Sequence, residues 1–219
     1  MLWWGERVKQ HMYLKLAIYS LLVLVAAPGF AVQAPQPQPF SADMAVTGAK
    51  NGENVTGKVY FSLPKTRMDM TAQGKNISMI SNGSTQTSYM IMHDQRMYIE
   101  MHGNQPNPMT RKIPSIDSSF DAQNPCGKQR DVTCKKEGTE SVNGRMCDKW
   151  VSTDWNRRTS TTWVDQKLYV PIRVISFEGT TMNLTNIKEG APAASTFEVP
   201  AGYTRMNLGG MMGGGRPPQ

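Results

Sequence analysis

The chain has 219 residues and a formal net charge of +7, from 24 Lys and Arg against 17 Asp and Glu. The basic residues are spread along the chain, and the largest cluster, Lys135-Lys136, is followed at once by Glu137. Nucleic-acid binding needs a dense basic stripe, so the charge pattern argues against that class of function and leaves only a general attraction to anionic surfaces.

The N-terminus has the order of a secretory signal peptide. Basic residues lead into an uncharged apolar run, Leu16–Ala27, which Pro28-Gly29 ends shortly before the small residue Ala31. The run is shorter than the roughly 20 residues of a transmembrane helix. We therefore expect residues 1–31 to be a signal peptide cleaved after Ala31, with Met12 as an alternative start, and the mature protein to be periplasmic or secreted. An uncleaved membrane anchor is the alternative.

Three further segments follow the expected signal peptide. Residues 32–39 are a Pro-rich linker, and residues 206–219 are a Gly/Pro-rich tail that we expect to be disordered. Residues 40–205 are long enough for a single domain with its own core. Within that domain the sequence predicts about eleven short strands, in the segments 40–47, 55–63, 66–72, 77–80, 86–101 (a hairpin), 133–140, 145–153, 158–164, 168–177, 180–188 and 195–199.

Turn residues punctuate these segments. Asn82-Gly83 and Asn143-Gly144 are strong hairpin signals, and Pro171 inside a strand indicates an edge strand or a bulge. The prolines of residues 102–130 exclude regular strand there. Residues 115–122 could form one short helix capped by Ser115, with Ile116 and Phe120 on one face as a lid; an ordered loop is the alternative.

The 86–101 hairpin is the centre of a methionine-rich region. The chain has 16 Met, and those of this region alternate with polar or aromatic residues, as in a strand with two different faces. If the strands are neighbours, their Met side chains form an apolar stripe on one sheet face. The residues expected to line a hydrophobic cavity are Met68, Met70, Met79, Met90, Met92, Met97, Ile99 and Met101, with Trp163 at its rim or as a core anchor.

The stripe has three interpretations. It fills the protein's own core, it lines a cavity for a lipid-like ligand to which flexible Met side chains adapt, or its thioethers bind Cu(I). The candidate metal set is Met90, Met92, Met97, Met101 and His102. His93 is excluded from that set without a bulge, because it alternates with Met92 and points to the other face.

Catalysis and a zinc site lack the necessary residues. After the signal peptide the only histidines are His93 and His102, and no Gly-x-Ser-x-Gly motif is present. The three cysteines, Cys126, Cys134 and Cys147, do not have zinc-ligand spacing. An oxidising compartment allows one disulfide among them, and spacing does not choose between the three pairings.

The order of elements resembles a known superfamily, the LolA/LolB/LppX-like periplasmic carriers and the secreted bacterial domains of unknown function related to them. The matching residues are Gly57-Lys58-Val59-Tyr60-Phe61, Arg67-Met68-Asp69, Asn82-Gly83, Met97-Tyr98, Gly138-Thr139-Glu140, Asn143-Gly144, Thr162-Trp163-Val164-Asp165, Pro171-Ile172-Arg173 and Phe197-Glu198-Val199-Pro200.

The resemblance implies a curved, incomplete antiparallel barrel whose concave face holds acyl chains under a helical lid. This chain lacks the helix that those carriers place before the first strand, so a smaller hydrophobic ligand fits better than a lipoprotein.

We thus expect a mainly β protein, a curved open antiparallel sheet with at most one or two short helices as a lid. Its expected function is non-catalytic binding of a hydrophobic molecule or acyl chain, without a cofactor, as a monomer that could have an envelope protein partner. A Met-rich copper-binding protein of the same compartment is the first alternative. A structural or interaction module without a small ligand is the second.

Overall fold

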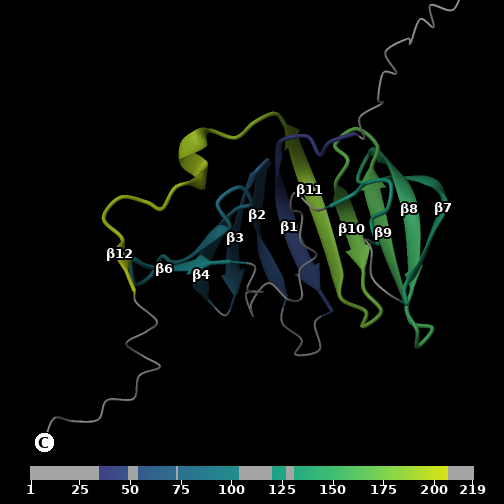
Figure 1. Ribbon diagram of the computed structural model, residues 1–219, viewed down its shortest axis with the longest axis horizontal. Coiled ribbons are helices and arrows are strands. Elements are labelled where there is room, and N and C mark those ends of the chain that lie inside the picture. The colour runs from purple at the N-terminus through teal and green to yellow at the C-terminus, as the bar shows by residue number, and fades with distance from the viewer. Residues whose placement is uncertain (1–34, 49–53, 73, 104–119, 127–130, 207–219) are drawn as a thin grey trace, which may run out of the picture. The chain divides into compact units, whose positions relative to one another are not determined.

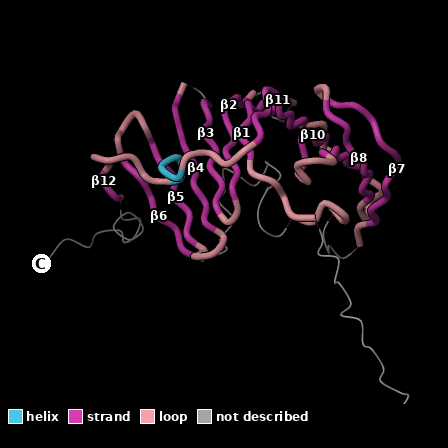
Figure 2. The backbone as a smooth tube through the Cα atoms, turned by 90° about the horizontal axis from the view of Figure 1, so that it is seen from above, coloured by secondary structure: helices cyan, strands magenta, loops and turns pink. Residues whose placement is uncertain are grey.

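The computed structural model describes residues 35–48, 54–72, 74–103, 120–126 and 131–206. The expected signal peptide, nearly all of the expected tail and the lid residue Ile116 lie outside these residues. In the described part, strands dominate, and they form a single sheet seen as one layer in both views (Figures 1 and 2). No helix in that part is long and apolar enough to cross a membrane.

Twelve strands and one short 3-10 helix make up the described domain. They are β1 Phe40–Thr47, β2 Val55–Ser62, β3 Lys65–Ala72, β4 Lys75–Asn82, β5 Thr87–Met92, β6 Met97–His102, β7 Thr133–Val142, β8 Arg145–Thr153, β9 Thr159–Asp165, β10 Pro171–Ile175, β11 Thr181–Glu189, η1 Ala194–Phe197 and β12 Thr204–Arg205.

The strand order is β12-β6-β5-β4-β3-β2-β1-β11-β10-β9-β8-β7. Each half of the chain folds as a meander of hairpins, and the two meanders meet where β1 pairs with β11. All pairings are antiparallel except that of β12 with β6. The sheet is curved and not closed into a barrel, which confirms the predicted fold class.

The main core follows directly from the alternation in the sequence. In β1, Phe40, Ala42, Met44 and Val46 are buried and alternate with less buried residues, as expected for a strand with one apolar face. The Phe40 ring stacks on Phe61 of β2 with centroids 5.6 Å apart. The core extends from this centre across the sheet to β4 on one side and β7 on the other.

The Asn143-Gly144 turn prediction is confirmed, whereas the turn that starts at Gly83 is a longer connection from β4, which ends at Asn82, to β5, which begins at Thr87. Asn143 and Gly144 both have positive φ, 53° and 78°, as a two-residue hairpin between β7 and β8 requires. Pro171 lies at a register irregularity between β9 and β10, so the bulge, and not the edge strand, is the correct alternative.

The C-terminal segment differs from the prediction. Residues 195–199, expected as a strand, contain η1 instead, and the short strand β12 was missed. Residues 190–206, which we call the C-terminal strap, run from β11 back to the β6 edge (Figure 1). Pro192 and Pro200 bracket η1 and disfavour a ladder there, while the buried Phe197 anchors it.

The expected lid helix is absent from its described part. Phe120–Ala122 are loop and turn, and Phe120 is half-buried. The carboxylate of Asp121 accepts the Gln123 backbone N–H, 2.8 Å, and this local bond competes with helix formation. The preceding residues of the expected helix lie outside the described chain.

The expected linker residue Gln38 donates its backbone N–H to Leu168 O, 2.8 Å, so this segment contacts the sheet.

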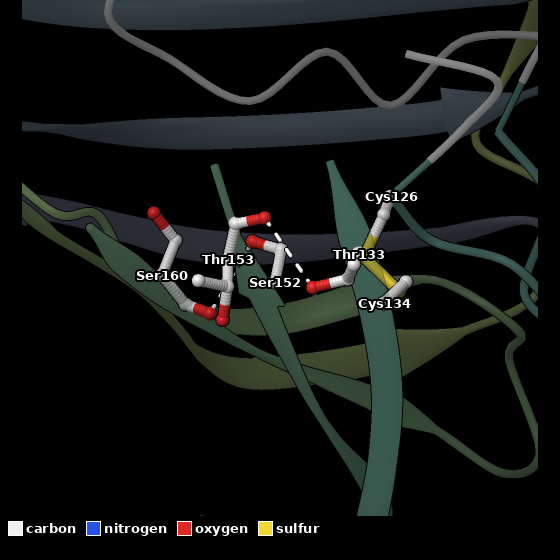
Figure 3. The surroundings of a disulfide bond; sticks show 6 residues. All are labelled: Cys126, Thr133, Cys134, Ser152, Thr153 and Ser160. Atoms are coloured by element: carbon white, nitrogen blue, oxygen red, sulfur yellow. Dashed lines mark hydrogen bonds between the residues drawn. A yellow bond between two sulfur atoms is a disulfide. The ribbon is translucent and has the colours of Figure 1, made fainter. Parts of the chain in front are cut away.

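The disulfide joins Cys126 to Cys134, with Cα atoms 5.9 Å apart. It fixes the start of β7, where Thr133 pairs with Thr153 of β8 (Figure 3). Cys147 is free and fully buried. Burial raises the pKa of its thiol to about 11, and the charge of Asp165 adds to that rise.

We expect Cys147 to resist alkylation in the native protein. The thiolate is the reactive form, and at pH 8 a pKa of about 11 leaves almost none of it. Iodoacetamide labelling followed by intact-mass measurement should show no adduct without denaturant and one adduct in guanidinium chloride. Rapid native labelling at pH 8 would contradict the burial of this side chain.

Candidate functional site

The strand pairings place the predicted Met residues in cross-strand rows. Met68 of β3 lies opposite Met79 of β4, which lies opposite Met90 of β5. A parallel row joins Met92 directly to Met97 across β5 and β6. Directly opposite residues point to the same side of a sheet. We call this surface the methionine face, formed by Met68, Met70, Met79, Met90, Met92, Met97, Ile99 and Met101.

Burial falls across the methionine face. Met70, Met79 and Ile99 are buried, with 5–7% of their surface exposed. The other five Met are half-buried; among them, Met92 and Met97 belong to neither apolar cluster of the described residues. Most of the face is therefore core or packs against it, and Met92 and Met97 at its outer end are half-buried without joining either cluster of described residues.

A polar pair borders the methionine face at one end. Ser81 and Ser88 are opposite residues, and the Ser88 hydroxyl donates to Ser81 Oγ, 3.2 Å. Opposite Ser88 on the other side lies Met101 of β6. A ligand with a long apolar part and a polar end would find both types of surface within three neighbouring strands.

The structure does not bring Trp163 into the methionine face. Trp163 is buried, and its ring lies 5.7 Å from the Arg173 guanidinium and 5.9 Å from the Lys149 ammonium. Arg173 and Lys149 are also its register partners, and the same row continues across β11 to Ala45. Ala45 alternates with Met44, so Trp163 points away from the methionine face.

The predicted metal set is only partly brought together. Met90, Met92, Met97 and Met101 share the methionine face. His102 instead alternates with Met101 to the other side, where its Nε2 lies 3.1 Å from Glu100 Oε1. The described residues contain no group of three or more His, Cys, Asp or Glu that could hold a metal ion.

The opposite face of β3–β5 carries a polar network that the sequence analysis missed. Asp69 Oδ1 accepts from Arg67 Nε at 2.6 Å and from Ser78 Oγ at 2.5 Å. Ser78 Oγ lies 2.6 Å from His93 Nε2, and His93 Nδ1 lies 2.9 Å from the Tyr203 hydroxyl. Polar residues alternating with Met in β3 and β4 were the available signal.

The network assigns the proton on His93 Nε2. The Asp69 carboxylate only accepts, so the single hydroxyl proton of Ser78 goes to it. Ser78 Oγ then accepts from His93 Nε2 and from Arg67 Nη2, the latter at 3.2 Å. His93 therefore donates from Nε2 to Ser78 Oγ, and its Nδ1 is hydrogen-bonded to the Tyr203 hydroxyl. Every group has a partner, so the network holds the C-terminal strap on this face.

The network is not a catalytic triad. A nucleophilic serine donates its proton to the histidine, whereas Ser78 donates to Asp69 and is 0% exposed. The Arg67 guanidinium also binds the strap, through Nη1 to Thr196 O at 2.9 Å. Its role is attachment of the strap.

A groove of about 620 Å³ runs beside this network on the same face. Its two cations are each paired, Lys58 with Asp43 at 3.0 Å and Arg67 with Asp69 at 2.6 Å. The Asn186 amide and the Lys58 ammonium bind the Asp43 carboxylate, and together they lower its pKa. The groove has a mixed lining with balanced charges, unlike the methionine face.

No protein-family model and no curated protein matches the chain. Solved structures do match its fold. An uncharacterized conserved protein from Thermus thermophilus aligns with a TM-score of 0.52 at 10% identity, covering 78% of this chain and 90% of that one. MucB aligns with a TM-score of 0.53 at 15% identity, covering 78% of this chain and 60% of MucB. The match thus spans less than two thirds of MucB.

A complex of MucA and MucB from Pseudomonas aeruginosa aligns with a TM-score of 0.51 at 13% identity, covering 78% of this chain and 59% of that one. A protein partner is therefore compatible with this fold. Mycobacterium tuberculosis lipoprotein LppX and a LolA superfamily protein from Nitrosomonas europaea match at TM-scores of 0.37 and 0.33, too low to align individual residues. The chain shares the fold of MucB and of the Thermus thermophilus protein, a curved open sheet of the kind that its sequence resemblance implied.

Proposed function

We propose that this protein is an exported, non-catalytic, monomeric binder of a hydrophobic, lipid-like ligand, which lies against the methionine face. The observation that carries the proposal is the Met92–Met97 pair, half-buried and outside both apolar clusters of the described residues. Isolated apolar side chains at a surface are ordinary, but a continuous row of flexible thioethers is suited to ligands of varied shape.

Two other observations support export and carriage. The Cys126–Cys134 disulfide fits an oxidising compartment, and the sequence predicts a signal peptide at residues 1–31. Open curved sheets offer a concave surface where a ligand can be held, and LolA/LppX-like folds have that shape. The buried position of Ser78 argues against a role of this serine as a nucleophile.

The test is a titration with a fluorescent fatty acid. Met92→Gln with Met97→Gln keeps side-chain length but makes the surface polar. Burying one apolar side chain contributes about 1.5–3 kcal/mol, so losing two should weaken binding at least about tenfold. Met146→Gln is the matched control, because Met146 is 54% exposed on β8, away from the methionine face. Equal affinities of the double variant and the control would refute the proposal.

Copper binding is a second candidate, favoured by the direct pairing of Met92 with Met97. A quadruple variant separates the two functions: it changes Met90, Met92, Met97 and Met101 to Leu. Leu keeps the apolar surface and removes the thioether ligands. We expect the Leu variant to bind the fatty acid with nearly unchanged affinity. Copper binding would be favoured instead if the wild type competed with a chelator for Cu(I) and the Leu variant did not.

A further inference from the structure

Three large apolar side chains are exposed at one end of the sheet. Trp155 in the β8–β9 turn is 75% exposed, Phe177 in the β10–β11 turn is 45% exposed, and Ile175 at the end of β10 is 37% exposed. Antiparallel neighbours place these two turns at the same end of the sheet (Figure 1). We call Trp155, Ile175 and Phe177, with Arg157 and Arg158, the aromatic tip.

Direct contacts hold the two turns together. The Arg158 guanidinium lies 3.8 Å from the centre of the Phe177 ring, and the Phe177 backbone N–H donates to Ser160 Oγ at 2.9 Å. Asp154 shapes the first turn, because its Oδ1 accepts the backbone N–H groups of Asn156 and Arg158, both at 2.9 Å. These contacts hold the two turns of the aromatic tip in a fixed arrangement.

The aromatic tip presents a cation at its surface. Arg157 is exposed and has positive φ, 61°, and its guanidinium makes no hydrogen bond or ion pair with the described residues. The Asp154 carboxylate is paired with Arg158 Nη2 at 2.6 Å, and its side chain is only 18% exposed. Glu178 in the second turn also has an interaction partner within the protein. Guanidinium groups bind phosphate oxygens with two parallel hydrogen bonds.

We propose that the aromatic tip docks the protein on the surface of a phospholipid bilayer that contains anionic lipids. Trp and Phe side chains are suited to the interface between headgroups and acyl chains, and the exposed Arg157 guanidinium beside them can bind lipid phosphates. Three side chains on hairpin turns form too small a surface for a stable protein interface, which buries about 800 Å² per partner. The same area is enough for shallow insertion into an interface.

The docking proposal rests on the proposed function, because a carrier of hydrophobic ligands takes them from, or gives them to, a membrane. The disulfide lies at the same end, at the start of β7, where Cys134 pairs with Ser152 of β8 (Figure 3). It stiffens the strand next to the docking turn.

The test is co-sedimentation of the protein, purified from cells that express the full chain, with vesicles of phosphatidylglycerol and phosphatidylethanolamine in equal parts. Trp155→Ser with Phe177→Ser should lower the bound fraction at least about tenfold in partition coefficient. Trp155→Ser alone avoids the Arg158–Phe177 contact and should show most of that loss. Met146→Ser is the matched control, since Met146 is an exposed apolar residue at the other end of β8.

Three outcomes would overturn the docking proposal. The first is that the wild type does not bind the vesicles. The second is that the Trp155 and Phe177 variants bind the vesicles as well as Met146→Ser does. The third is that these variants no longer bind a purified protein partner while their binding to vesicles is unchanged. Arg157→Glu should weaken binding to phosphatidylglycerol vesicles and leave the weaker binding to phosphatidylcholine vesicles unchanged. All tip variants should keep their fatty-acid affinity in solution, so failure of docking is distinguishable from failure of ligand binding.

Discussion

Asp165→Ala should destabilise the protein by about 3–5 kcal/mol, because it breaks a buried ion pair and leaves Arg145 with Glu189 as its remaining carboxylate partner. Asp165 is 1% exposed and accepts from Arg145 Nε, from Arg145 Nη2 at 3.3 Å, and from the backbone N–H groups of Lys167 and Leu168 at 2.8 and 2.7 Å. The hydrogen bond to Asp165 is the main cause that raises the pKa of Arg145.

Loss of this carboxylate affects three strands at once. Arg145 begins β8, Asp165 ends β9, and Glu189 at the end of β11 binds Arg145 Nη2 at 2.9 Å. Of the two orphaned backbone N–H groups, that of Leu168 is buried, and an unsatisfied buried group costs about 1–3 kcal/mol. The contacts of Asp165, Arg145 and Glu189 therefore hold β8, β9 and β11 together.

Urea unfolding followed by circular dichroism measures the effect. Asp43→Ala is the control, because Asp43 forms an exposed ion pair with Lys58, and exposed pairs contribute at most about 1 kcal/mol. The stability of Asp165→Asn should lie between those of Asp165→Ala and Asp43→Ala, since the amide oxygen can still accept hydrogen bonds. An Asp165→Ala variant as stable as Asp43→Ala would show that the buried pair is dispensable.

Gly57→Ala should destabilise the protein by at least about 2 kcal/mol. A Cβ atom at Gly57 would lie 1.9 Å from Asp69 O and 3.1 Å from Met70 Cα, and backbone cannot move aside as a flexible side chain can. Overpacking of this kind typically costs about 1–3 kcal/mol, occasionally more. Gly57 lies between Met44 and Met70 in one cross-strand row, where β2 and β3 approach closely.

The position of Gly57 links stability to ligand binding. The displaced residues, Asp69 and Met70, belong to the polar network and to the methionine face respectively. We therefore expect Gly57→Ala to weaken both the fatty-acid affinity and the folding stability. Thr56→Ala, at the exposed neighbouring residue, is the control in the same thermal melts. A melting temperature for Gly57→Ala equal to that of Thr56→Ala would contradict the close approach of β2 and β3.

The strands could be predicted from the sequence because their signal is local. Alternation in β1 and the Asn-Gly turn before β8 both depend on residues a few positions apart. The rows of the methionine face followed from the same alternation, once neighbouring hairpins were assumed to pair.

The C-terminal strap and its polar network could not be predicted, since they depend on distant contacts. Tyr203 binds His93 across 110 residues, and Thr196 binds Arg67 across 129. Neither pairing leaves a periodic pattern. The disulfide was undetermined for a similar reason: spacing treats three pairings alike, and only the fold shows that Cys147 is enclosed in the core.

Photocrosslinking with a diazirine fatty acid, followed by peptide mass spectrometry, locates a ligand bound to the methionine face. We expect adducts to concentrate on β5 and β6, at Met92 and Met97 and their neighbours on the methionine face, and excess oleate to suppress them. Adducts confined to Tyr89 and Tyr98 on the opposite face, or no adduct that oleate suppresses, would contradict the account.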